Sequence, residues 1–298
     1  MRNGSSLQMR GQGSAAGVGR GIDLRPDLPF TTDRVVGIDL TRIIHVDEVA
    51  SARGGNGGGG GGGGTGGTTF APYTSGAVGA YNITIEFVGS WTQDLYNIFV
   101  SSANTLSTLI IGDLPNVSVR SKGGIQTIDD IKIVAELGAI DGEGNILGQA
   151  GPTSVRTTSS LPATAEMTFD IADVTAMGLE MFEEVVLHEM AHSLGVGSIW
   201  GRLGLVTNGL FTGEDAVAEY HELGGTLAGI PVEQDGGAGT AGSHWDEEIF
   251  DNELMTGYIN SGNNPLSEMT AASFADLGYT LASNYGNVAE IYEIPTMA

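Results

Sequence analysis

Cysteine is absent from this 298-residue chain. Its absence excludes disulfides, a thiol nucleophile and a propeptide cysteine that occupies a metal, and it leaves the redox compartment unspecified. Long apolar runs are missing as well, since none approaches the ~20 residues that a membrane-spanning helix needs. Hydrophobic residues still make up 41% of the sequence. A sizeable core is therefore expected, in one large domain or two small ones.

Basic residues are scarce: the only lysines are Lys122 and Lys132, and the formal net charge is −24. Residues 1–53 hold seven of the 12 basic groups and six of the 36 acidic ones, which leaves a net charge of −25 for the rest. Such a surface repels nucleic acid and anionic membranes, because phosphate binding needs clustered cations. It either attracts cationic peptides over long distances or serves solubility in a saline setting.

The segment His188-Glu189-Met190-Ala191-His192 follows an apolar stretch and predicts a chemically active helix. Residues four apart lie on one helix face, so both imidazoles can bind one zinc ion that keeps a position open for water. Glu189 can then take a proton from that water. The alternative is an ordinary helix with two solvated histidines, but such groups on a buried helix need a metal or partners. Gly195 is expected to end the helix in a left-handed conformation.

Two histidines leave a zinc site incomplete, and the chain has three more. His45 precedes a glycine-rich tract, outside the expected catalytic body, and His221 lies in an acidic segment that is typical of a solvated helix end. His244 differs from both, because Met255 follows it in the segment Glu253-Leu254-Met255-Thr256-Gly257.

Together these segments resemble the leishmanolysin family of metzincin zinc metallopeptidases. In that family a long insertion, here residues 196–243, separates the HExxHxxG motif from the third histidine, and a methionine follows in a tight turn beneath the metal. The resemblance covers roughly residues 80–282, including 110–115, 141–150, 266–270 and 276–279. It implies one catalytic Zn²⁺ and these roles: metal ligands His188, His192 and His244, catalytic residue Glu189, and Met-turn floor Met255.

The resemblance also implies a fold and a setting. The expected class is α+β, a metzincin-like zinc metallopeptidase domain with a twisted sheet and long helices. Its active-site helix carries HExxH, and a mostly irregular or helical C-terminal subdomain carries the Met-turn. The expected partners are peptide or protein substrates, with no nucleic acid and no transmembrane segment. An extracellular or secreted location is expected by the resemblance alone, and the absence of cysteine favours a bacterial-type version.

The chain divides into three predicted parts, of which the last holds the catalytic residues. They are an N-terminal segment 1–53 that is either a disordered tail, propeptide-like or a wrongly assigned start, a glycine-rich linker 54–69, and a metallopeptidase domain 70–298 with subdomains about 70–195 and 196–298. The linker follows from the entropy that glycine loses on ordering. The first part carries no standard signal peptide. As a propeptide it must cover zinc without cysteine, and Asp47 and Glu48 are conceivable ligands.

Local patterns predict most elements of the domain. They are a strand at 81–87, a long helix after a capping box that begins at Ser90, strands at 116–120 and 131–135, a helix at 214–223, and a last helix at 267–277 between Ser267 and Gly278. The capping residues follow the preference for serine at the start of a helix and glycine after its end. Residues 141–145 begin like a calcium loop but lack its final glutamate, so a glycine-rich turn is expected.

The expected function is that of a zinc-dependent endopeptidase that hydrolyses peptide bonds through a metal-activated water, with Glu189 as the general base. Two alternatives stay open. Glu247 begins an ExxxD pattern at 247–251, and in thermolysin-like enzymes a glutamate in such a pattern is the third zinc ligand. A non-catalytic surface or adhesion module that retains the metallopeptidase fold is the other alternative, although such modules usually lose the general base, and Glu189 is intact.

Overall fold

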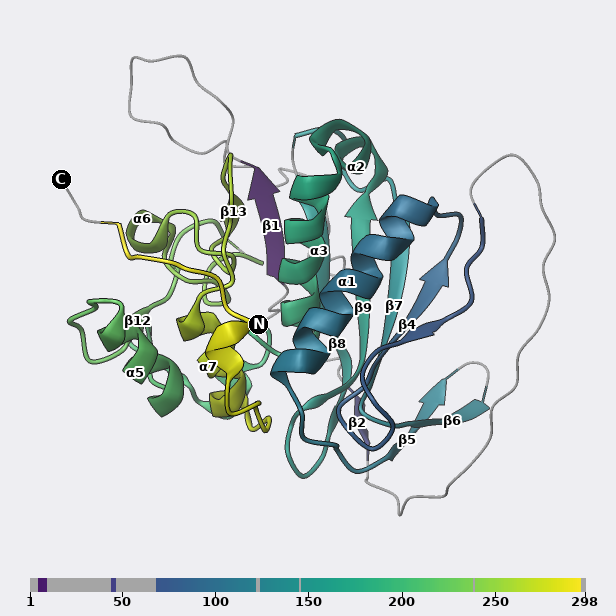
Figure 1. Cartoon of the computed structure of the whole chain (residues 1–298), viewed down its shortest axis with the longest axis horizontal. Helices are drawn as coiled ribbons and strands as arrows, with labels where there is room; N and C mark the ends of the chain where they lie inside the picture. The colour runs from purple at the N-terminus through teal and green to yellow at the C-terminus, as the bar shows by residue number, and fades with distance from the viewer. Residues whose placement is uncertain are drawn as a thin grey trace.

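A twisted sheet of eight strands forms the centre of the computed structural model, which describes residues 5–9, 44–46, 68–121, 124–144, 146–237 and 239–295. Its strands follow the order β13-β1-β8-β9-β7-β4-β3, and β2 joins beside β8 (Figure 1). Their bounds are β1 Ser5–Met9, β2 Ile44–Val46, β3 Tyr73–Thr74, β4 Ile83–Val88, β7 Ile131–Gly138, β8 Ile146–Arg156, β9 Pro162–Asp170 and β13 Tyr258–Ile259. Strands β4, β7 and β9 run parallel, and β8 runs antiparallel to β9.

The predicted strands are confirmed. Residues 81–87 and 131–135 contribute to β4 and β7, where buried residues alternate with half-buried ones. Residues 116–120 contribute to β5, Val117–Ser121, which forms a separate hairpin with β6, Gly124–Ile128. Strands β8 and β9 have no counterpart among the predictions. Glycine and proline interrupt the pattern of β8, and Pro152 stands beside a break in its register with β9, where proline is tolerated in a sheet.

Two long helices cover one face of the sheet (Figure 1). Helix α1, Gln93–Leu109, packs on α3, Leu179–Ser193, which contacts β8 and β9 and is preceded by the short α2, Ile171–Met177. The N-cap of α1 is Thr92, whose hydroxyl accepts the N–H of Leu95 at 3.3 Å. The predicted cap at Ser90 is therefore wrong, because Trp91 is still extended and pairs with Thr68.

After α3 the chain forms short elements joined by loops. They are α4 Trp200–Leu203, β10 Val206–Thr207, β11 Leu210–Phe211, α5 Glu214–Glu222, β12 Ile230–Pro231, α6 Glu247–Phe250, α7 Glu268–Leu277 and the 3-10 helix η2 Tyr285–Asn287. Both predicted helices are confirmed as α5 and α7. The hydroxyl of Ser267 accepts the N–H of Thr270 at 3.1 Å, and Gly278 is left-handed. The stacked indoles of Trp200 and Trp245 lie in the core of this part.

Eight residues of the predicted N-terminal part are described, and they form β1 and β2. Both strands pair with β8. The rest of residues 1–53, including Asp47 and Glu48, and residues 54–67 of the predicted linker lie outside the described residues. The boundaries of the three parts stay a prediction.

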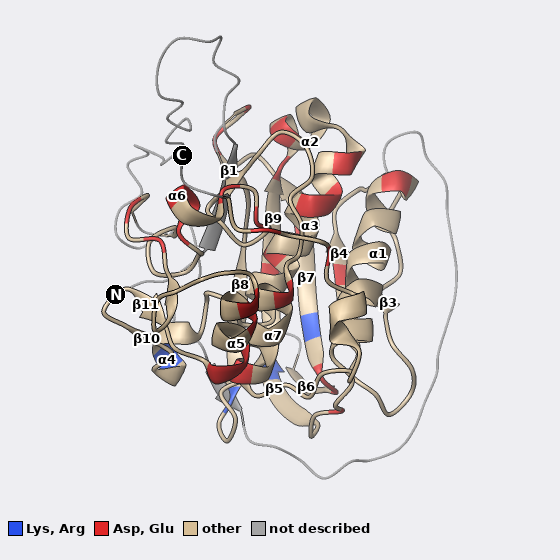
Figure 2. Ribbon diagram, turned by 60° about the vertical axis from the view of Figure 1, so that its left-hand side comes forward, with Lys and Arg blue, Asp and Glu red and all other residues tan. Residues whose placement is uncertain are grey.

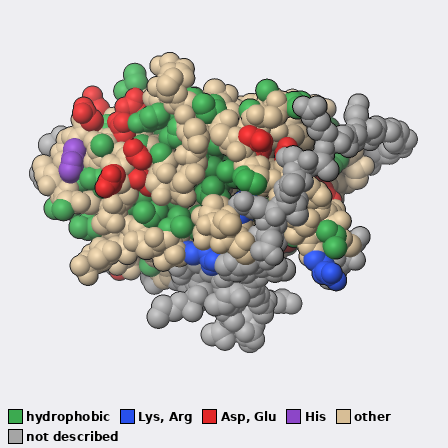
Figure 3. All heavy atoms as spheres, turned by 90° about the horizontal axis from the view of Figure 1, so that it is seen from below, with side chains coloured by type: hydrophobic (Ala, Val, Ile, Leu, Met, Phe, Trp, Pro, Cys, Tyr) green, Lys and Arg blue, Asp and Glu red, His purple; other side chains and the backbone are tan. Residues whose placement is uncertain are grey.

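Acidic side chains outnumber basic ones on the described part of the molecule. Figure 2 shows Asp and Glu on most helices and few Lys or Arg, and Figure 3 shows groups of acidic side chains on the face seen from below. Within the described ranges, no helix combines the length and the apolar character that crossing a membrane requires. The fold is thus a mixed arrangement of a twisted sheet and helices, which agrees with the expected class at this level.

Candidate metal centre

Helix α3 brings His188 and His192 to one buried point. Both side chains are fully buried, and their Nε2 atoms lie 2.8 Å apart. The helix then stops abruptly: the N–H of Gly195 donates to the carbonyl of His192 at 3.0 Å, and the N–H of Val196 donates to that of Ala191 at 3.1 Å. Gly195 has φ of 115°, in the region that favours glycine. This turn leads the chain away directly beneath the second histidine.

His244 joins the two helical histidines from a loop that follows β12. Its buried Nε2 lies 3.1 Å from Nε2 of His192 and 3.3 Å from that of His188. The loop is fixed on both sides of the histidine, because Glu233 donates its N–H to the His244 carbonyl and Trp245 donates its N–H to the carbonyl of Met255. Among the residues described, these three histidines form a group whose nitrogens all lie within 4.8 Å of one another.

Each imidazole uses its other nitrogen to contact the backbone. Nδ1 of His188 lies 2.6 Å from the carbonyl oxygen of Leu254, and Nδ1 of His192 lies 2.8 Å from that of Val196. Nδ1 of His244 lies 3.0 Å from the carbonyl oxygen of Thr240. A carbonyl only accepts, so each Nδ1 carries the proton and each Nε2 presents a lone pair to the shared point. Three lone pairs that face one another need a cation between them.

Electrostatics keeps these imidazoles neutral. Burial lowers the pKa of His188 and His192 well below the usual value of 6.5, and the neighbouring imidazoles lower it further. Burial also lowers the pKa of His244 to about 4. Neutral imidazole is the form that binds zinc, and tetrahedral ligands at about 2.0–2.1 Å from the ion lie about 3.3 Å apart. The measured separations of 2.8 to 3.3 Å fit such an ion with a small expansion.

Two glycines allow the approach of backbone and side chains around this group. A Cβ on Gly197, whose φ is 68°, would collide with the carbonyl oxygen of Ser243 and stand 3.2 Å from the His192 ring. A Cβ on Gly148 of β8 would stand 3.2 Å from Cγ of Glu189. Glu189 is fully buried and therefore lies against β8, in space that the glycine leaves free. Neither glycine was among the candidate residues predicted from the sequence.

Met255 lies in a tight turn that reaches back to the histidines. The N–H of Thr256 donates to the carbonyl of Glu253 at 3.1 Å, and the carbonyl of Leu254 within this turn accepts from His188. Met255 is fully buried. The turn therefore orients one imidazole through its backbone, whatever its side chain does.

The carboxylate of Glu253 fixes this turn, and sequence reasoning missed it. One oxygen accepts the N–H of Met255 at 2.6 Å, and the other accepts the hydroxyls of Ser267 and Thr270 at the start of α7. Burial raises the pKa of this fully buried carboxyl above its usual range. The one available signal was an acidic residue two positions before a turn methionine, in a chain where acidic residues are common.

The other residues considered as ligands lie apart from the group. Glu247 begins α6, where its backbone N–H donates to a Glu233 oxygen and its own carboxylate accepts from Asn260 at 3.4 Å. No metal-type group of described residues includes it. Nε2 of His221 lies 2.9 Å from the carbonyl of Leu227, on the exposed side of α5. His45 belongs to β2 and pairs with Val155.

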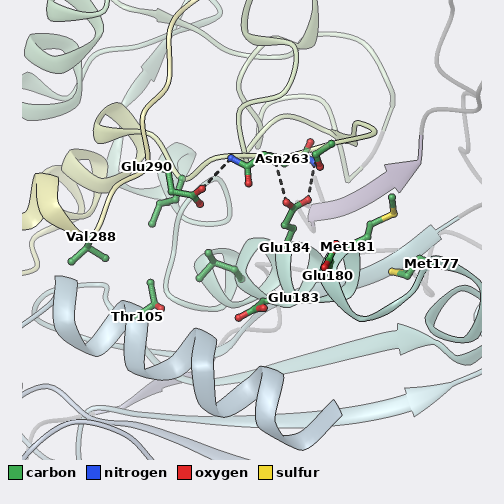
Figure 4. Close-up of a pocket in the computed structure, with 13 residues that line it drawn as sticks. Thr105, Met177, Glu180, Met181, Glu183, Glu184, Asn263, Val288 and Glu290 are labelled. Atoms are coloured by element: carbon green, nitrogen blue, oxygen red, sulfur yellow. Dashed lines mark hydrogen bonds between the residues drawn. The ribbon is translucent and has the colours of Figure 1, made fainter. Parts of the chain in front are cut away.

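A pocket of about 790 Å³ lies on another face of α3 (Figure 4). Its lining includes Glu180, Glu183, Glu184 and Leu187, which recur at the spacing of one helix face, together with the loop at 262–264. Glu184 accepts two hydrogen bonds from Asn264 there, as Figure 4 shows. None of the three histidines lines this pocket, so it is separate from the candidate metal centre.

Comparison with known proteins points to one family. The family model described as leishmanolysin matches residues 210–293, which include His244 and Met255. Leishmanolysin of Leishmania donovani is 29% identical over 170 residues, which cover 52% of this chain and 28% of that protein. Leishmanolysin of Leishmania major is 30% identical over 185 residues, 57% of this chain and 30% of that protein. A leishmanolysin homolog of Crithidia fasciculata is 31% identical over 140 residues, 42% and 21% respectively. The chain thus matches less than a third of the length of these relatives.

Proposed function

We propose that this leishmanolysin-like chain is a zinc-dependent endopeptidase whose metal ligands are His188, His192 and His244. The observation that carries the proposal is the convergence of three buried Nε2 atoms while each Nδ1 faces a backbone carbonyl. The similarity to leishmanolysin supports the same class of reaction. Because the match covers less than a third of those relatives, the activity of the whole protein is part of the proposal.

The mechanism assigns a distinct task to each residue. Zinc bound there would supply a Lewis acid that lowers the pKa of a water molecule and polarises the peptide carbonyl. Glu189 accepts the proton of the attacking water and passes it to the departing amine. Its burial against β8 keeps its carboxylate away from bulk water, which strengthens its electrostatic effect on the reacting atoms. The three backbone carbonyls hold the imidazoles in the orientation that binding requires.

The finer fold assignment belongs to the same proposal. We assign the domain to the metzincin type, with the turn at Met255 as its Met-turn and the methionine as an apolar floor beneath the histidines. Glu247, which the thermolysin-like alternative needs as a ligand, instead packs among Glu233 and Asn260. The proposed substrates are peptides and proteins, encountered outside the cell. The bacterial-type version and the exclusion of nucleic acid stay predictions from composition.

The decisive experiment is the substitution Glu189→Gln in the zinc-loaded chain. The variant should retain one zinc per chain, because the ligands are intact, and its rate on casein should fall by about 10²–10⁴-fold, the usual contribution of general acid–base catalysis. Glu183→Gln is the matched control, since Glu183 lies on the same helix but is exposed. An unchanged casein rate in the Glu189 variant, with zinc still bound, would rule out the proposed mechanism.

A further inference from the structure

Strand β8 has one side that takes up extended chain from the N-terminal part. Strand β9 pairs with one side of β8. On the other side, β1 pairs antiparallel with the first half of β8 and β2 pairs parallel with residues 154–156. The backbone N–H and C=O groups along such an edge bind any extended peptide that lies beside them. This edge is therefore a peptide-binding surface that the chain itself fills.

The first of these strands passes beside the candidate metal centre. Leu7 of β1 pairs with Gly148, the residue whose missing side chain leaves room for Glu189. Neighbouring strands lie about 4.8 Å apart, so the backbone of β1 crosses within one strand spacing of that glycine. Strand β1 also contacts helix α3, which carries two of the histidines. The first occupant of the edge thus lies where the chemistry is proposed to occur.

The other side of β1 is paired as well. Gln8 and Met9 pair in parallel with Tyr258 and Ile259 of β13, which begins three residues after Met255. Figure 1 shows β1 between β13 and the sheet, alongside α3. An extended peptide in this position has backbone partners on both sides, one from each subdomain. Because such bonds involve only the main chain, they hold a peptide of almost any sequence.

Charge favours the same placement. Arg2 and Arg10 flank β1, and residues 1–53 hold seven of the 12 basic groups of the chain. The remainder has a net charge of −25, as calculated above from the same totals. The long-range field therefore attracts the residues around β1 to the acidic body.

We propose that residues 5–9 occupy the strand position in which an extended peptide substrate pairs with β8, and that they hold the enzyme inactive until they are displaced. This inference rests on the proposed peptidase activity. The occupant is part of the same chain, so its effective concentration at the edge is high, and a free peptide competes with it poorly. Displacement or removal of the N-terminal part then exposes the edge and permits a substrate to bind as an added strand.

The position of β1 is tested without any activity measurement. The chain lacks cysteine, so Ser6→Cys with Gln149→Cys introduces a single pair of thiols at opposed positions of β1 and β8. Opposed residues of antiparallel strands have Cβ atoms about 4.5–5.5 Å apart, close to the separation in a disulfide. Diamide treatment should form an intramolecular disulfide that peptide mapping identifies. The control, Ser6→Cys with Ile125→Cys in the exposed part of the β5–β6 hairpin, should stay reduced.

The inhibition is tested with a substitution in the full-length, zinc-loaded chain. Leu7→Pro removes a backbone donor and disfavours the strand, so kcat/KM for a fluorogenic peptide should rise about tenfold or more. Gln12→Pro, three residues beyond the strand, is the matched control and should leave kcat/KM unchanged. In the oxidised Ser6→Cys, Gln149→Cys variant the rate should fall below that of the untreated variant, and reduction by a phosphine should restore it.

The outcomes separate this inference from the proposed function. If the two cysteine pairs oxidise equally slowly, β1 does not pair with β8 and the inference is wrong, whatever the activity. It is also wrong if the disulfide forms but the oxidised and reduced proteins cleave peptide at the same rate. If neither the wild type nor the Leu7→Pro variant shows activity that a zinc chelator abolishes, the proposed peptidase function fails, and the inhibitory role falls with it.

Discussion

The two halves of the candidate metal centre are held in place in different ways. His188 and His192 project from a regular helix whose apolar residues pack on a sheet, so many contacts share the task of positioning them. His244 comes from a loop in which individual bonds, to Glu233 and from its ring to Thr240, set its place. The comparison teaches that the helical half should tolerate most single changes nearby, whereas the loop half should depend on a few residues.

The largest effect should come from removing the loop ligand itself. His244→Ala leaves two imidazoles and should weaken zinc binding by more than the 10–100-fold that loss of an outer partner typically costs, about two decades at most. Glu247→Ala is the control, since that residue lies outside the histidine group. Zinc content after dialysis checks both variants. Full zinc in the His244 variant, or its loss in the Glu247 variant, would restore the thermolysin-like alternative.

A smaller effect is expected from Gly197→Ala, which touches no ligand. Its Cβ would collide with the Ser243 carbonyl, so the chain that carries His244 must shift. We expect zinc affinity to fall by about 10–100-fold, as for loss of a residue that orients a ligand. Gly204→Ala is a close control, because Gly204 has φ of 71° against 68° but open space where its Cβ would lie. Both variants carry backbone strain, so equal zinc affinities in competition titrations would show that the steric argument is wrong.

The same contrast explains how much of the structure could be predicted from the sequence. Helix α3, the strands β4 and β7, and helix α7 with its cap at Ser267 follow from local periodicity, which a sequence displays directly. Strand β8 escaped because Gly148, Gly151 and Pro152 contradict strand propensity. One of these glycines leaves the space that Glu189 needs, so the residue that hid the strand serves the site.

Residues that act over long sequence distances were harder to find. Glu253 bonds to Ser267 and Thr270, and no local pattern announces such a partnership in an acidic chain. His244 could be singled out only through its place before Met255 and the resemblance to a family. The pairing of β1 with β8 joins residues more than 130 positions apart, as Leu7 and Gly148 illustrate, and periodicity contains no information about it.

Glu253→Gln tests the turn beneath the histidines and should have a moderate effect. The amide keeps one oxygen acceptor but faces the remaining donors with its NH₂ group, so a buried N–H or hydroxyl loses its partner. Such a loss costs about 1–3 kcal/mol of stability. Because Leu254 of the same turn accepts from His188, zinc affinity should fall too, by about tenfold. Glu248→Gln on the exposed side of α6 should change neither quantity in urea unfolding and zinc titration.

Asp130 offers the corresponding test in the sheet region, with the smallest effect on the metal centre. Like Glu253 it is a fully buried carboxyl, and it accepts the N–H groups of Asn82 and Leu114 at 2.7 Å. Burial raises its pKa from 3.8 to about 7, although these two bonds oppose the shift. The folded chain therefore holds the proton more tightly than the unfolded one. The stability that this gives is fully present below pH 3.8 and is lost as the pH rises through about 7.

The free energy of unfolding should accordingly fall by up to about 1.4 kcal/mol per pH unit across that window because of this group alone. Asp130→Asn removes the titration, so its unfolding free energy should depend less steeply on pH than that of the wild type, while zinc affinity stays the same. Urea titrations between about pH 5 and 7 measure the difference. Parallel curves would mean that Asp130 is ionised in the fold. A loss of zinc in this variant would mean that the two regions are coupled, and the contrast between a collectively held helix and an individually held loop would not hold.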